Sequence, residues 1–352
     1  MTEIDRRRER VRPPFISRQD WKLGTGCDTL SDTASRGTAA HSIEHLRGST
    51  ALASSTTFPY SAAELDRFRQ VQRLAYDIAE QVESQLEVGM TEVEVCQLII
   101  DAQADNDVTQ VFHQPFAWIG QRTVLGADWI TTSLGAKDPS GAGSAAPFFP
   151  TAREITHGAP VIIDLAPVVG GTSTDVGYSC AVGTNATFHE LDRAMPRIRS
   201  FLLEGIRAGE SLLSLYRELD FLLAQRGLEN CHQHYPDRAL GHLVFPLEPE
   251  PDRPSPLPGF GTAAAEGLLA AGLSAVESAT SYPVWNDTSY SNYPACPGLW
   301  AIEPHIGLEG VGVKFEEILV VTEDDAFWLD DHLSHAQRWA ASGYSIEPLG
   351  RL

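Results

Sequence analysis

The sequence predicts an α+β protein whose two halves repeat one order of elements, a pair of helices followed by strands. The first observation is the helical spacing of apolar residues over residues 61–105. The second is a similar pair of helical segments over 189–227. The third is that strand-like runs follow each pair, around 109–134 and 161–179 in the first half and 299–321 in the second. Because the two halves share little residue identity, the internal duplication is predicted from this order of elements alone.

Local signals place the ends of the predicted helices. Ser61 followed by Glu64 forms a capping-box pattern, and Thr91 followed by Glu94 marks the start of a second helix. Gly89 separates these two helices. The second pair is divided in the same way at Gly209, so QLEVGMTEVEVCQLI and GIRAGESLLSLYREL follow the same plan.

Composition sets the remaining boundaries. Residues 1–60 are rich in Gly, Ser, Thr and Ala with little apolar periodicity, which predicts a low-complexity N-terminal extension. Residues 61–345 are expected to form one folded domain that carries the functional site. Within it, the stretch near 246–299 is rich in Pro, Gly and Ala and is interpreted as an insertion.

Charge and cysteine content exclude several classes of function. The chain has 352 residues, 43% of them apolar, and a formal net charge of −21, which disfavours nucleic acid or an anionic membrane as a partner. Its five cysteines are scattered and contain no CxxC pair, so neither a disulfide framework nor a thiolate zinc site is expected. There is no apolar run of about 18 residues and no secretory signal. We therefore expect a cytoplasmic protein.

Two aspartates lie in an apolar hairpin-like stretch, VIIDLAPVVGGTSTDVGYS. Asp164 follows three apolar residues, and Asp175 comes after the turn at Gly170 and Gly171. An unpaired carboxylate is costly to bury, so a cation is expected beside the pair. That cation is either an arginine or a metal ion.

Three further polar residues lie in or beside strand-like runs and complete a set of five. They are His242 in ALGHLVF, Glu303 in LWAIEP and Glu316 in VGVKFEEILVV. Four carboxylates and one imidazole suit one or two divalent ions of manganese, iron, cobalt or zinc. A single residue of this kind more often has a structural role. In the last run, alternation along a strand puts Lys314 and Glu316 on one face and Glu317 on the other, so one of the two glutamates could face solvent.

The order of these motifs resembles the pita-bread metallopeptidase family, which includes methionine aminopeptidase, aminopeptidase P, prolidase and the non-metal creatinase. The resemblance covers about residues 61–330 and rests on these motifs: IIDLAP, TSTDVGYS, LGHLVF, AIEPHIG and KFEEILVVTED. It implies a pita-bread fold with pseudo-twofold αα-β halves around a curved antiparallel sheet. It also selects Glu316 over Glu317 as the ligand.

The resemblance further implies a dinuclear centre of two divalent ions held by Asp164, Asp175, His242, Glu303 and Glu316. Asp164 would chelate one ion, Asp175 and Glu316 would bridge both, and His242 and Glu303 would complete the other. A metal-bound hydroxide would attack an amide while Glu303 moves the proton. The arginine alternative is disfavoured because none of the five motifs contains an arginine.

Histidines usual in active peptidases of this family are missing at their expected places. The loop before Asp164, GAGSAAPFFPTAREI, contains no histidine. A second histidine is common a few residues after the ligand histidine, but the segment after His242 reads FPLEPEPD. His113 and His305 are candidate catalytic replacements. His232 and His234 are expected to line the approach or the surface rather than bind metal.

Three functions follow from these observations. The first is a hydrolase resembling aminopeptidases and X-Pro peptidases. The second is a diverged metalloenzyme that acts on a small non-peptide molecule, with iron and non-hydrolytic chemistry as one form. The third is a metal-free binding module, which the four buried acids disfavour. The expected partner is a small peptide or small-molecule substrate, and a homodimer is left open.

Overall fold

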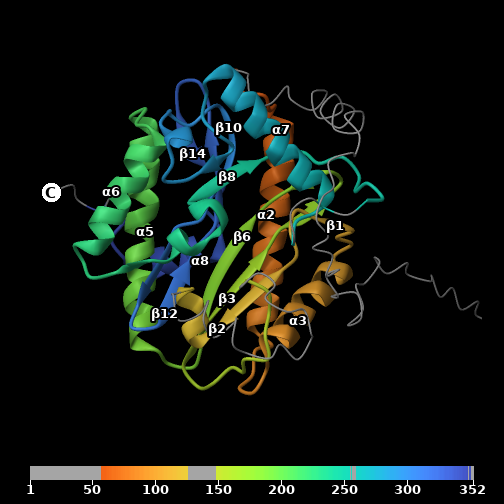
Figure 1. The fold of residues 1–352 in the computed structure, drawn as a ribbon. Coiled ribbons are helices and arrows are strands. Elements are labelled where there is room, and N and C mark those ends of the chain that lie inside the picture. The colour runs from red at the N-terminus through yellow and green to blue at the C-terminus, as the bar shows by residue number, and fades with distance from the viewer. Residues whose placement is uncertain (1–56, 126–147, 254, 256–258, 348, 350–352) are drawn as a thin grey trace, which may run out of the picture.

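The computed structural model describes residues 57–125, 148–253, 255, 259–347 and 349. The predicted extension, residues 1–60, lies outside the described residues as far as residue 56. Part of the loop GAGSAAPFFPTAREI also lies outside them. The described chain consists of helices around small antiparallel sheets (Figure 1).

The first helix pair is α2 (Ala62–Glu83) and α3 (Glu92–Asp105). Both predicted capping boxes are confirmed. The side-chain oxygens of Ser61 and Thr91 each accept a hydrogen bond from the backbone N–H of the glutamate three residues later. The carboxylate of that glutamate in turn accepts a hydrogen bond from the backbone N–H of the capping residue. Reciprocal caps of this kind satisfy amides that the first helical turn leaves without partners.

The second helix pair is α5 (Ala186–Arg207) and α6 (Leu212–Ala224). The predicted break at Gly209 is confirmed, with a φ of +72° that glycine adopts without strain. In Figure 1 α5 and α6 lie on one side of the strands, and α2 and α3 lie on the other.

Within the described ranges the paired strands are antiparallel and form four sheets, ordered β1-β4-β5, β2-β3-β6, β12-β11-β7 and β14-β13-β10-β8-β9. The predicted ligands lie in or directly beside strands of the second and fourth of these sheets. The strands are β1 (Gln110–Val111), β2 (Phe116–Ile119), β3 (Ala159–Leu165), β4 (Pro167–Val169), β5 (Thr172–Ser173), β6 (Val176–Val182), β7 (Glu229–Asn230), β8 (Gly241–Val244), β9 (Val284–Trp285), β10 (Gly298–Ile302), β11 (His305–Leu308), β12 (Val311–Lys314), β13 (Glu317–Val321) and β14 (Ala326–Trp328).

Two further helices complete the described chain. α7 (Thr262–Ser278) lies inside the predicted insertion, and α8 (Ser334–Ala341) lies near the C-terminus. Short 3-10 turns link several strands, including η2 (Gly120–Val124), η3 (Cys231–His234), η4 (Pro236–Arg238) and η5 (Ser289–Ser291). No helix in the described ranges is both long and apolar enough to cross a membrane.

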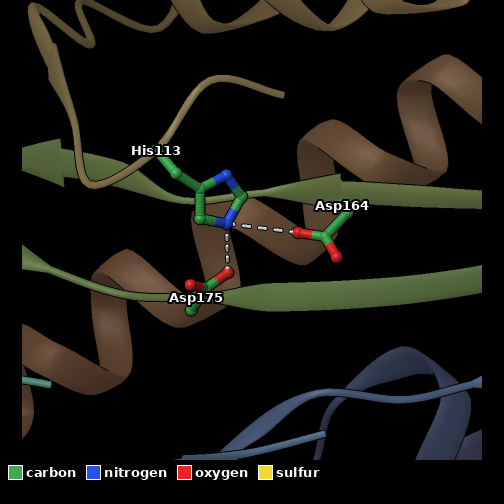
Figure 2. A group of neighbouring side chains, drawn as sticks. All are labelled: His113, Asp164 and Asp175. Carbon is green, nitrogen blue, oxygen red and sulfur yellow. Dashed lines mark hydrogen bonds and ion pairs between the residues drawn. The ribbon is translucent and has the colours of Figure 1, made fainter. Parts of the chain in front are cut away.

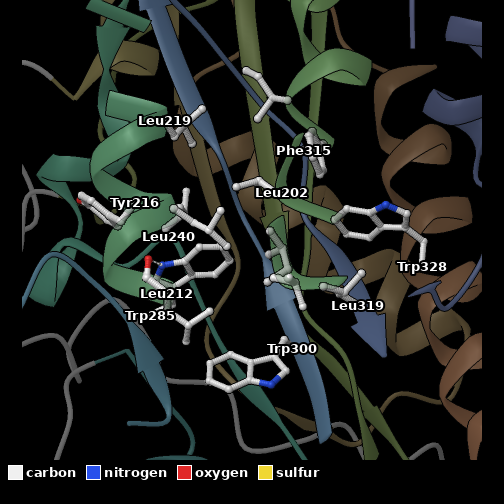
Figure 3. Packing of buried hydrophobic residues seen from close by; sticks show 14 of the residues in the cluster. Leu202, Leu212, Tyr216, Leu219, Leu240, Trp285, Trp300, Phe315, Leu319 and Trp328 are labelled. Carbon is white, nitrogen blue, oxygen red and sulfur yellow. Dashed lines mark hydrogen bonds between the residues drawn. The ribbon is translucent and has the colours of Figure 1, made fainter. Parts of the chain in front are cut away.

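Each helix pair covers its own apolar core. One core joins α2 and α3 to β3 and β6. The larger core joins α5 and α6 to strands of the second half, and Figure 3 shows the indoles of Trp285 and Trp300 among leucines. The Trp285 ring N–H donates to the backbone carbonyl of Leu212 at 2.6 Å, so even the polar atom of this side chain is satisfied. The two cores hold the sheets in fixed positions, and the sheets in turn position the polar cluster described next.

Candidate metal centre

The first-half sheet positions the two aspartates. Asp164 is the penultimate residue of β3, opposite Gly177, and Asp175 directly precedes β6. The chain between them makes the short strands β4 and β5 and turns at Gly170 and Gly171, both with positive φ. Both aspartates are buried, as the sequence predicts.

The second-half sheet supplies the other three predicted ligands. His242 lies in β8 opposite Ala301 of β10, and Glu303 directly follows β10. Glu316 lies between β12 and β13. Because β10 pairs with both β8 and β13, these three buried side chains come from neighbouring chain segments.

Asp175 lies at the centre of the cluster. Its Oδ1 is 2.9 Å from Nε2 of His113, and its Oδ2 is 3.2 Å from Nε2 of His242. His113 Nε2 is also 3.2 Å from Asp164 Oδ1, as Figure 2 shows, and His242 Nε2 is 3.8 Å from Glu316 Oε1. Two groups of potential ligand atoms therefore meet at Asp175, each within 4.8 Å: His113 with Asp164, and His242 with Glu316.

A lysine joins the fifth predicted ligand to the others. Lys314 Nζ lies 2.7 Å from Asp164 Oδ2, 3.0 Å from Glu316 Oε2 and 3.2 Å from Glu303 Oε2. Its side chain is fully buried, and its ammonium also lies 5.1 Å from the centre of the Tyr235 ring. The sequence reasoning considered only arginine as a protein cation and so missed Lys314. The signal was present, because period two places Lys314 and Glu316 on one strand face.

Charge and burial act against each other in this cluster. Burial alone would raise the pKa of Asp175, but His113 and His242 lower it below its usual range. Burial and the negative charge of Asp175 raise the pKa of Glu316 well above normal. Burial would lower the pKa of Lys314, but Asp164 and Glu316 raise it more, so this residue is cationic. The imidazoles add positive charge, because burial would lower the pKa of His113 and of His242 but Asp175 raises both above the usual value.

Glu317 belongs to a different site from its neighbour Glu316. It is fully buried rather than solvent-facing, and both its oxygens accept N–H groups of Arg199 at 2.8 Å. His335 Nε2 lies 2.7 Å from the same carboxylate. Burial would raise the pKa of Glu317, but Arg199 and His335 lower it to about 2. Glu317 is thus an ion-paired structural carboxylate.

The two histidines expected to be catalytic have different positions. His113 contacts both aspartates, whereas Nδ1 of His305 is hydrogen-bonded to the Tyr235 hydroxyl at 3.0 Å. The His305 ring also stacks on Trp118, with ring centres 6.4 Å apart. Among the described residues, no acid of the cluster contacts His305, so His305 is placed to position the Tyr235 and Trp118 side chains. His232 is buried against Asp220 at 2.9 Å, away from the predicted ligands.

The donor set fits a divalent metal. Both cluster imidazoles place Nδ1 against a backbone carbonyl, that of Gln114 for His113 and that of Leu243 for His242. Such a bond fixes the tautomer and leaves Nε2 free to bind a metal. Imidazole with several carboxylates is a donor set for iron, manganese, cobalt or zinc. The residues therefore fit one or two bound ions.

Comparison with known proteins identifies the fold and the family. A sequence model of metallopeptidase family M24 matches residues 66–323. A search of curated proteins found no match. Among solved structures, an X-Pro aminopeptidase from Thermotoga maritima MSB8 has 15% identity and a TM-score of 0.54, covering 81% of this chain and 64% of that one. A dipeptidase, PepE, from Mycobacterium ulcerans has 19% identity and a TM-score of 0.51, covering 77% and 58%.

The chain thus spans about three fifths of the length of these solved relatives, and at such identities they support the fold alone. The family match covers most of the chain and includes all five predicted ligands. The expected α+β pita-bread architecture is confirmed. The chain belongs to metallopeptidase family M24.

Proposed function

We propose that this chain is a metal-dependent hydrolase that cleaves a peptide or amide bond near a free N-terminus or an X-Pro bond. The observation that carries the proposal is the buried cluster of four carboxylates and two imidazoles around Asp175, in a chain of family M24. The names of the solved relatives, an X-Pro aminopeptidase and a dipeptidase, support a small peptide as the substrate.

The residues proposed to hold the ions are those expected from the sequence: Asp164, Asp175, His242, Glu303 and Glu316. When bound, the ions would polarise the substrate carbonyl and acidify a water molecule. Glu303 is proposed to hold and return the proton that this chemistry releases. Lys314 positions Glu303 for that role through the 3.2 Å contact with its Oε2.

Lys314 places one condition on the two-ion form of the proposal. If Asp164 chelates one ion through both oxygens and Glu316 bridges both ions, then Asp164 Oδ2 and Glu316 Oε2 are ligand atoms. Both oxygens now accept hydrogen bonds from Lys314 Nζ. That arrangement therefore requires the ammonium to release them on metal binding.

The proposal is tested with a panel of aminoacyl and X-Pro peptides in the presence of manganese, cobalt, iron or zinc. Glu303→Gln should lower kcat by at least about 100-fold while the purified protein keeps its fold. Glu87→Gln, an exposed site on the first-half surface, is the matched control and should keep full activity. Failure of metal-loaded wild-type protein to cleave any peptide would contradict the peptidase assignment.

A second candidate function is favoured by His113. Two imidazoles with carboxylates form a donor set that also suits non-haem iron chemistry on a small non-peptide molecule. Retention of iron together with oxygen consumption, and no peptide cleavage, would support this alternative. The cytoplasmic location and a homodimer remain predictions, to be checked by fractionation and by light scattering.

A further inference from the structure

His113 is held rigidly beside the two aspartates. It lies between β1 and β2 and forms a β-bridge with Phe260. Its ring stacks on Phe116, with centres 5.1 Å apart and planes 24° apart. The side chain is buried, so its direction toward the cluster is set by packing.

His113 and His242 are built in the same way. In each residue Nδ1 lies close to the carbonyl of the next residue, 2.6 Å away in His113 and 3.1 Å away in His242. The His242 ring also stacks on an aromatic ring, that of Phe112, at 5.3 Å and 14°. In both histidines Nδ1–H donates to the carbonyl and Nε2 is directed at Asp175.

Nε2 of His113 faces two carboxylate oxygens at once. It lies 2.9 Å from Asp175 Oδ1 and 3.2 Å from Asp164 Oδ1. In the metal-free protein a proton on Nε2 is shared with these oxygens, and a divalent ion would take the place of that proton. An ion about 2.1 Å from each ligand fits atoms that all lie within 4.8 Å of one another.

Lys314 and the imidazoles engage different oxygens of the same carboxylates. Lys314 holds Oδ2 of Asp164 and Oε2 of Glu316, whereas the imidazoles lie nearer to Oδ1 of Asp164 and Oε1 of Glu316. Asp175 likewise presents Oδ1 to His113 and Oδ2 to His242. Two ion positions that use only Oδ1 of Asp164 and Oε1 of Glu316 are therefore compatible with Lys314 in its present place, unlike the bridged arrangement considered above.

We propose that His113 is a metal ligand equivalent to His242, so that each side of Asp175 binds one ion with its own imidazole. The first position comprises His113, Asp164 and Asp175, and the second comprises Asp175, His242 and Glu316. This arrangement revises the ligand set proposed above in one respect: Glu303, which belongs to neither group, keeps its proton role beside Lys314 but is no longer required as a ligand. This inference rests on the metal dependence proposed above but not on the substrate.

The test counts imidazoles by X-ray absorption at the zinc edge, using protein without an affinity tag loaded with zinc alone. Wild-type protein with two zinc equivalents should show about one imidazole per zinc, and half that value if His242 alone binds. His113→Ala should retain one zinc equivalent instead of two. His242→Ala should do the same, and His189→Ala, which removes an exposed histidine, should retain two.

The possible outcomes separate this inference from the proposed function. Two zinc equivalents retained in His113→Ala, with an unchanged number of imidazoles bound, would overturn the role of His113 alone. Should that variant fail to fold, the wild-type imidazole count still decides, and a value of one half per zinc rejects the proposal. Protein that binds no zinc, manganese, cobalt or iron would instead overturn the metal-dependent function itself.

Discussion

At the scale of single residues, Lys314 distinguishes this metal centre from a site built of acids and imidazole alone. Its ammonium contacts three carboxylates from two different sheets and from the link between β12 and β13. Burying such a charge is costly unless its partners are close and well directed, and here all three lie within 3.2 Å. Lys314 therefore holds the ligand carboxylates in place before a metal binds.

Replacing Lys314 with an apolar residue should lower the stability of the apo protein but strengthen its binding of divalent metal. Lys314→Met leaves three buried carboxylates without their cation, which should lower the apo free energy of unfolding by about 3–5 kcal/mol. The added negative potential should tighten divalent binding about tenfold or more. Urea unfolding with chelator, and then with zinc, measures both effects.

The control for this substitution is Arg67→Met, which removes an exposed cation on α2 and should change neither quantity. An apo Lys314→Met protein as stable as wild type would show that the ammonium does not support the carboxylates. Weaker rather than tighter zinc binding would show that Lys314 acts only by positioning its partners.

Residue types in motifs predicted much of the site, but side-chain direction could not be read from them. The four acids and one imidazole could be selected because each is a polar residue in or beside an apolar run, and all five are buried. His113 was selected only as a catalytic replacement, and its contact with Asp175, 62 positions away, depends on tertiary packing. The same holds for Lys314, whose partner Asp164 is 150 positions away.

At the scale of elements, β6 makes room for the Lys314 side chain of β12 and fixes its backbone. Gly177 in β6 lies where a Cβ would be 2.9 Å from Cδ and 3.0 Å from Nζ of Lys314, so the missing side chain makes room for the ammonium. Ser179 fixes the backbone of Lys314, because its Oγ donates to the Lys314 carbonyl at 2.7 Å and accepts the Lys314 amide at 2.9 Å. Both contacts join the two strands beside the metal centre.

A methyl group added to β6 should therefore displace the lysine. Gly177→Ala is expected to destabilise the protein by about 1–3 kcal/mol, the usual cost of overpacking a dense interior. In the double variant Gly177→Ala with Lys314→Ala, the clash is removed, so the two effects should be non-additive by about 1 kcal/mol or more. A double-mutant cycle from thermal or urea unfolding measures this coupling.

Additive effects in that cycle would show that Gly177 and Lys314 are not in the tight contact described. Gly343→Ala does not serve as a control because its φ is positive. Gly298→Ala in β10 is suitable, because the added Cβ lies near a methyl group of the flexible Leu243 side chain in β8. Gly298→Ala should thus show no coupling to Lys314→Ala.

Local signals predicted helices well and sheets poorly, for a physical reason. A helix start depends on neighbouring residues, so the boxes at Ser61 and Thr91 could be read directly. Strand register depends on distant partners, and the division of the strands into four sheets could not be derived from alternation alone. The same limit left the choice between Glu316 and Glu317 to the family resemblance.

At the scale of the whole molecule, the candidate metal centre draws its residues from both halves of the chain. His113, Asp164 and Asp175 come from the first half, and His242, Glu303 and Glu316 come from the second. Apolar packing joins the halves as well, since Phe112 lies in the larger core and Phe68 of α2 packs with Val244 of β8. A cation bound in the polar cluster would add to this contact, because its proposed ligands come close only in the folded chain.

Chelation should therefore lower the stability of the whole described domain rather than of one loop. A ligand at 100 times its Kd adds about 2.7 kcal/mol to the free energy of unfolding, which corresponds to a rise in Tm of roughly 5 °C or more in a domain of this size. Calorimetry of chelated protein, before and after zinc or manganese is added, measures the shift.

Asp175→Asn removes the residue shared by both proposed ion positions and should abolish the metal-induced rise in Tm. Asp101→Asn, an exposed aspartate on α3, should leave the shift intact. An equal metal-induced rise in Asp175→Asn would locate the stabilising ion outside the cluster and refute the assignment of the site.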